Sequence, residues 1–183
     1  MTEDEPRWLR DARSGWTHRG RKRPPFAVQP GPGQESVWDY PRPPAIVRDS
    51  REVVVRHGEV LLARSRDACR VLETASPPTF YLPQEDVMAE LLRPEHGSSF
   101  CEWKGQARYW GLHEAPGVPV AWTYPTPFDA FAALAGCYAF YPERVACYVA
   151  GERVRTQPGG FYGGWITAEV VGPFKGDPGT SNW

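Results

Sequence analysis

The sequence has no surplus of charge of either sign, with 21 Lys and Arg, 22 Asp and Glu and a formal net charge of −1. General attraction to a polyanion needs a basic surplus, so we expect neither nucleic acid nor an anionic membrane surface as a partner. The chain also has no run of about eighteen apolar residues and no apolar stretch of the signal-peptide kind near its N-terminus. We therefore expect a soluble, cytoplasmic protein.

Motifs that bind metals or phosphates are also missing. The four cysteines, Cys69, Cys101, Cys137 and Cys147, lie far apart and form no CxxC pair, so their spacing indicates neither a zinc ribbon nor a thioredoxin-like redox site. Reduced, mostly buried thiols are expected instead. The sequence contains no DxD pair and no P-loop. We predict no metal site and no cofactor, and the sequence identifies no catalytic residue.

Proline, glycine and aromatic residues are abundant instead. The 183 residues include 20 Pro, 18 Gly, 8 Trp and 8 Tyr, a composition that favours many turns, half-buried β surface and aromatic binding sites. The length suits a single core. Three segments are predicted: a Pro-rich N-terminal extension (1–48), a core β domain (49–156) and a Gly-rich C-terminal tail (157–183) that docks on the core.

Short apolar runs bounded by turn residues predict a mainly β fold of compact, twisted antiparallel sheets with two short helices. Hairpins are expected over 53–62, with a turn at His57–Gly58, and over 145–154, with a turn at Ala150–Gly151. A further strand is expected over 166–171.

Two segments have the signals of short helices. Residues 84–92 follow a proline, carry acids in the first turn and place their apolar residues on one face. Residues 128–136 have Thr126 as the expected N-cap, Pro127 at the first helical position and Gly136 as the expected stop.

Residues 100–110, FCEWKGQARYW, concentrate reactive and aromatic side chains. They form either one continuous strand or a hairpin. We favour a hairpin with a two-residue turn at Gly105–Gln106, because a type II′ turn prefers glycine at its first position. Trp103 then pairs with Arg108, and Lys104 lies on the opposite face from Trp103.

Four motifs, PPTFYLPQEDV, FCEWKG, AWTYPTP and AFYPERV, occur in this order. In these motifs, over residues 51–154, the chain resembles the uncharacterised family known as domain of unknown function 427. The resemblance implies a β domain similar to the β-tent (Mss4-like) folds, some of which hold ligands in an aromatic cage. It supplies no catalytic residues. A nucleotidyltransferase label used for the family would require carboxylates converging on Mg²⁺ and a phosphate-binding loop, and the sequence contains neither motif.

Aromatic residues on neighbouring strands, together with two charged residues, form the candidate ligand site. Its predicted members are Glu73, Tyr81, Trp103, Lys104, Tyr109, Trp122 and Tyr124. The same pattern also suits a structural role, with the rings as cross-strand packing, Lys104 as a solvated charge and Glu73 as an outward carboxylate.

The favoured function is binding of a small molecule in an aromatic-lined pocket, with the ligand and any reaction unknown. The alternative is a non-catalytic protein-interaction module, which requires a contiguous exposed apolar patch. A third hypothesis, a metal-dependent hydrolase or transferase, requires bound metal in the purified protein. The oligomeric state is not predicted.

Overall fold

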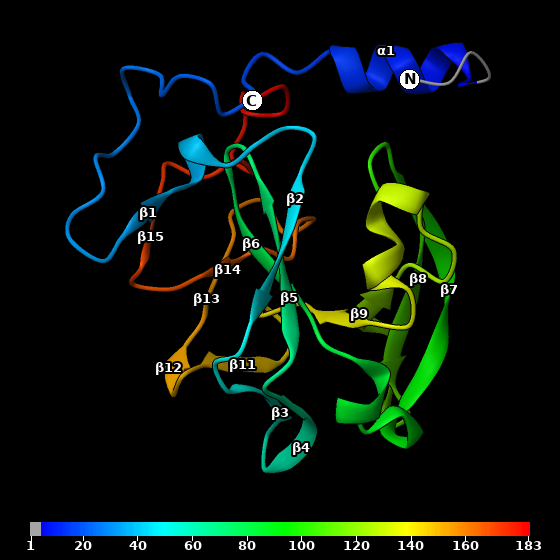
Figure 1. The fold of residues 1–183 in the computed structure, drawn as a ribbon. Coiled ribbons are helices and arrows are strands. Elements are labelled where there is room, and N and C mark those ends of the chain that lie inside the picture. Colours follow the sequence, from blue (N-terminus) through cyan, green and yellow to red (C-terminus); the bar gives the residue numbers. More distant parts are fainter. Residues whose placement is uncertain (1–4) are drawn as a thin grey trace.

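The computed structural model describes residues 5–183 and is mainly β (Figure 1). The first four residues of the predicted N-terminal extension lie outside the described range. The predicted fold class, a mainly β fold of antiparallel sheets with short helices, is confirmed. Within residues 5–183, no helix is long and apolar enough to cross a bilayer. The β-tent likeness stays a prediction.

Three larger antiparallel sheets form the body of the described chain (Figure 1). The first has the order β2-β5-β6 and consists of β2 (Ala45–Asp49), β5 (Ala68–Glu73) and β6 (Ser76–Tyr81). The second has the order β12-β11-β3-β4 and consists of β3 (Val53–His57), β4 (Val60–Ser65), β11 (Ala146–Val149) and β12 (Glu152–Arg153). The third has the order β10-β9-β8-β7 and consists of β7 (Leu92–Cys101), β8 (Gly105–Leu112), β9 (Ala115–Thr123) and β10 (Tyr138–Phe140).

Both predicted hairpins of the second sheet are confirmed. In the β3–β4 hairpin, His57 pairs with Val60 and Gly58 has a φ of 55°, so the turn begins one residue later than predicted. The β11–β12 hairpin turns at Ala150 and Gly151, as predicted, and both residues have positive φ. Positive φ at both central residues is what a two-residue type I′ turn requires.

Two small strand pairs hold the terminal segments. β1 (Glu35–Ser36) runs parallel to β15 (Val170–Val171), and β13 (Arg155–Thr156) pairs antiparallel with β14 (Trp165–Ile166). The single strand expected over 166–171 is therefore wrong, because a turn closed by Val170 N–H and the Thr167 carbonyl divides it between two sheets.

Both predicted helical segments are helical, but as short 3₁₀ turns. The first contains η2 (Gln84–Asp86) and η3 (Ala89–Leu91). Between them, Val87 bridges to Ala63 and Met88 N–H donates to the Leu62 carbonyl, so pairing with β4 interrupts the helix. The second contains η4 (Asp129–Leu134).

The η4 turn differs from its prediction in its start and in its regularity. Its N-cap position is Phe128, so Thr126 and Pro127 precede the turn and the predicted cap is wrong. Phe131 has non-helical angles within it. The N-terminal segment also contains a further 3₁₀ turn, η1 (Val37–Asp39), and an α-helix that we did not predict, α1 (Arg7–Ser14).

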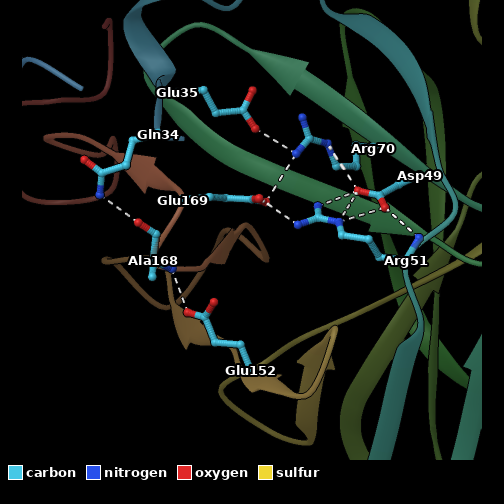
Figure 2. Close-up of polar contacts among 8 residues, drawn as sticks. All are labelled: Gln34, Glu35, Asp49, Arg51, Arg70, Glu152, Ala168 and Glu169. Carbon is cyan, nitrogen blue, oxygen red and sulfur yellow. Dashed lines mark hydrogen bonds and ion pairs between the residues drawn. The ribbon is translucent and has the colours of Figure 1, made fainter. Parts of the chain in front are cut away.

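Charged side chains fasten both terminal segments to the β domain (Figure 2). Arg70 Nη1 donates to Glu35 at 2.7 Å and to Glu169 at 3.4 Å, and Arg70 Nε lies 3.7 Å from Asp49. Arg51 donates to Asp49 at 2.5 Å and to Glu169 at 2.7 Å. Glu35 from the N-terminal segment and Glu169 from the C-terminal segment therefore share a guanidinium of the first sheet.

Candidate functional site

Residues 100–110 form a hairpin, as predicted, but the predicted turn at Gly105–Gln106 is wrong. Cys101 pairs with Gly105 and Phe100 with Gln106, so the turn consists of residues 102–104. Gly105 has a φ of 97°. Gly105 therefore supplies a positive φ directly after the turn, and not at the first position of the turn as predicted. As a result, the pairing expected between Trp103 and Arg108 does not form.

A cavity of about 240 Å³ lies beside this turn, between the first and third sheets. Its wall contains six of the seven predicted site residues: Glu73, Tyr81, Lys104, Tyr109, Trp122 and Tyr124. The seventh, Trp103, is only 5% exposed and is not part of the wall. The guanidinium of Arg13 lies 5.4 Å from its ring centre. Lys104 and Trp103 therefore face different surroundings although they are neighbours in one turn.

Both terminal segments complete the cavity wall. Trp16 comes from the N-terminal segment, and Gln157, Phe161, Tyr162 and Lys175 come from the C-terminal segment. These residues could not be predicted from the sequence because their segments show no strand or helix period. The rarity of lysine was a signal in the sequence, since Lys175 is one of three lysines in the chain.

The aromatic side of the cavity is a connected set of rings. The Tyr81 ring centre lies 6.2 Å from that of Trp122 and 6.3 Å from that of Tyr124, and Trp122 lies 4.5 Å from Tyr141. Trp122 Nε1–H donates to the Tyr81 hydroxyl at 3.3 Å. Burial raises the pKa of Tyr81 to about 12, so its phenol is neutral at physiological pH.

Lys104 is a buried ammonium in the wall, with 8% of its surface exposed. Its Nζ lies 5.9 Å from the Tyr124 ring centre, within the range of a cation–π contact. Burial opposes its charge, but attraction to nearby ionisable groups, among them the Glu73 carboxylate, raises its pKa well above the usual value. Lys104 is therefore positively charged at neutral pH.

Lys175 is the second buried amine, with 3% of its surface exposed. Its Nζ lies 3.7 Å from the Trp16 ring centre and 5.1 Å from that of Tyr162. Burial lowers the pKa of Lys175 to about 8; Glu73 partly offsets this effect, and Arg42 adds to it. The pKa values of the two lysines in this cavity are therefore shifted in opposite directions.

The two carboxylates of the cavity already have partners within the protein. Arg42 Nε donates to Glu73 at 3.2 Å, and Trp16 Nε1 donates to Glu102 at 2.8 Å. In the described part of the chain, neither lysine amine donates a hydrogen bond within 3.5 Å or forms an ion pair with a carboxylate within 4.0 Å. With Arg42 included, three cations meet two carboxylates here, so the net charge at the cavity is positive.

The cysteines and histidines do not gather into a metal site among residues 5–183. All four cysteines are free thiols. Cys101 lies in the cavity wall, with its Sγ 3.8 Å from Glu102 Oε2. A nucleophilic thiolate is favoured by cationic neighbours. Cys101 lies near the Lys104 ammonium, but its hydrogen-bond partner is the Glu102 carboxylate and no base within the described residues is paired with it, so we assign it no nucleophilic role.

The fold and the cavity together define a mainly β domain with a ring-lined cavity that contains two amines. The chain belongs to the family described as a domain of unknown function (DUF427), whose model matches residues 45–151, more than half of the chain. No curated protein matches the chain. The family match includes the strands around the cavity but excludes Trp16, Tyr162 and Lys175.

Proposed function

We propose that this protein binds a small molecule in the cavity between the first and third sheets. The observation that supports the proposal is that aromatic rings and two amines without a hydrogen-bond partner in the described chain line the same cavity. Ligand sites combine an apolar, often aromatic wall with a few placed polar groups. The cavity volume of about 240 Å³ is just below the usual range of about 300–1,000 Å³. The expected ligand is therefore the size of a small metabolite.

A thermal-shift screen with a metabolite library tests this proposal when it is combined with a cavity-filling variant. Ser99 on β7 belongs to the cavity wall, whereas its neighbour Ser98 is exposed and does not. Ser99→Trp should fill the cavity, and Ser98→Trp adds the same ring on the other face of the strand.

A true cavity ligand should stabilise the wild type and Ser98→Trp but not Ser99→Trp. A ligand present at a hundredfold its Kd stabilises the folded state by about 2.7 kcal/mol. The proposal fails if no compound stabilises the protein, or if every stabilising compound acts equally on Ser99→Trp.

An exposed aromatic pair favours a second function, docking of a protein partner. Trp8 on α1 is 56% exposed, Phe100 is 50% exposed, and their ring centres lie 5.1 Å apart. Exposed apolar groups that cluster in this way often mark interaction surfaces. Under this hypothesis, Trp8→Ser should reduce self-association or partner binding in analytical ultracentrifugation while leaving cavity ligands unaffected, because Trp8 lies outside the cavity wall.

A further inference from the structure

Lysine is used sparingly in this chain, and its placement is uneven. Three lysines occur among 21 Lys and Arg residues: Lys22, Lys104 and Lys175. Lys22 is exposed, whereas the other two are buried in the wall of the same cavity. Arginine supplies the other cations, including those of the ion pairs in Figure 2.

Both buried amines keep donors free for a ligand. An ammonium has three N–H donors and no acceptor. The contacts that fix Lys104 and Lys175 are with the faces of Tyr124, Trp16 and Tyr162, and these contacts use no hydrogen-bond acceptor. A buried charge without a counter-ion is costly, so an anion placed between these groups would be stabilising.

The acidic groups nearby supply that counter-charge only in part. Glu73 accepts from Arg42, and Glu102 accepts from Trp16, so each carboxylate is engaged by another group. A cationic ligand would share carboxylates that already have donors and would also meet two ammonium groups. The charge arrangement therefore selects against amines and in favour of acids.

We propose that the ligand of this cavity is a small organic anion, a carboxylate or phosphate monoester joined to a flat apolar group. This inference rests on the proposed function and specifies its ligand class. Lys104 and Lys175 donate to the anionic oxygens, and the rings of Tyr81 and Trp122 contact the flat group.

Four probes that share a phenyl ring but differ in charge test this ligand class: phenylacetate, phenyl phosphate, phenylacetamide and phenethylamine. Calorimetry at about pH 7 should show that at least one anionic probe binds about tenfold or more tightly than the neutral amide, with the amine weakest. Inorganic phosphate alone should bind more weakly than phenyl phosphate because it makes no ring contact.

Charge-removing variants provide the second arm of the test. Lys104→Gln and Lys175→Gln should each weaken binding of the anionic probe by about tenfold to a hundredfold while leaving amide binding within about twofold. Lys22→Gln should change neither. Thermal unfolding checks that each variant is folded, and Lys→Met variants replace any glutamine variant that is not.

The outcomes separate this inference from the proposed function. The anion assignment is overturned if the amide or amine binds as tightly as the acids, or if both lysine variants keep full affinity for the anionic probe. It is also overturned if the only cavity ligands found in the metabolite screen are neutral or cationic, in which case small-molecule binding still stands. If no probe and no screened compound binds, the proposed function itself fails.

Discussion

The Nζ atom of Lys175 lies 3.7 Å from the centre of the Trp16 ring, so residues from opposite ends of the chain meet at one cavity. Each is anchored separately. Trp16 donates to Glu102 in the β7–β8 turn at 2.8 Å, and the backbone N–H of Lys175 donates to the Ala75 carbonyl at 2.7 Å. The terminal segments also touch directly, through Thr17 N–H and the Asn182 carbonyl (Figure 1). The cavity is therefore completed by segments outside the family match.

Removing the Trp16 ring should open the cavity on its N-terminal side. Trp16→Ala deletes the contact with Lys175 and the hydrogen bond to Glu102, so anion affinity should fall by about fivefold to thirtyfold, as loss of about 1–2 kcal/mol predicts. Calorimetry with the best anionic probe measures the change. Trp8→Ala is the matched control, because Trp8 is 56% exposed and lies outside the cavity wall. Equal losses in the two variants would contradict a local role for Trp16.

Anion affinity should decrease as the pH rises through about 8. The pKa of Lys175 is lowered to about 8 by burial, so its ammonium is present below that pH and lost above it. The groups that influence its charge are Glu73, Arg42, Glu102 and Cys101. Lys104 keeps its proton over the same range because its pKa is raised.

The sign of this pH effect can be checked by proton uptake. A bound anion stabilises the Lys175 ammonium, so binding near pH 8 should take up a proton, which appears as a buffer-dependent heat in calorimetry. Lys175→Gln should bind weakly but with little change in affinity between about pH 7 and pH 9.5. A wild-type affinity that stays constant or increases over this range would contradict the role of Lys175.

Amine-reactive labelling should distinguish the two buried lysines. Cyanate reacts with the neutral amine, so at about pH 8 Lys175 should be carbamylated well before Lys104, whose proton is held more firmly. Peptide mass spectrometry gives the extent of reaction at each lysine, with exposed Lys22 as the internal reference. An anionic cavity ligand should protect Lys175 and leave Lys22 unchanged. Faster reaction at Lys104 than at Lys175 would be inconsistent with these pKa directions.

Local signals in the sequence predicted the local parts of the fold. The β11–β12 hairpin turns at Ala150–Gly151 because the two turn residues alone determine its geometry. The β7–β8 register depended on more distant contacts. Phe128 N–H donates to the Lys104 carbonyl at 3.3 Å, and this contact holds the three-residue turn. A glycine with positive φ fits either turn, so the sequence around Gly105 did not decide between them.

The candidate site was predictable where its residues alternate on strands. Tyr81, Tyr109 and Trp122 come from strands of the first and third sheets, and the structure brings them to one cavity. Trp16 and Lys175 come from segments without such a pattern. Their positions depend on tertiary contacts with the core, which no short window of sequence records.

The charged network in Figure 2 should contribute measurably to stability. Arg70 is 12% exposed and contacts Glu35, Asp49 and Glu169. Arg70→Met removes a positive charge that balances these carboxylates. The free energy of unfolding should therefore fall by about 2–3 kcal/mol, somewhat less than for a fully buried pair. Urea denaturation measures the loss. Limited proteolysis should also show earlier cleavage in the terminal segments, because Glu35 and Glu169 connect them to the β domain.

Arg48→Met is the matched control for Arg70→Met. Asp49→Asn tests how the stability contributed by the network depends on pH. Arg48 pairs with Asp67, but their side chains are 71% and 65% exposed, so solvent screens the pair and Arg48→Met should leave the free energy of unfolding almost unchanged. Burial opposes the charge of Asp49, but hydrogen bonds from Arg51 outweigh this effect and lower its pKa. Its stabilising contribution is therefore present above the unfolded pKa of about 3.9 and lost as the pH falls through the lower folded value. Asp49→Asn should make stability less sensitive to pH in that acidic window, and an unchanged acid profile would show that the network does not stabilise the fold through this carboxylate.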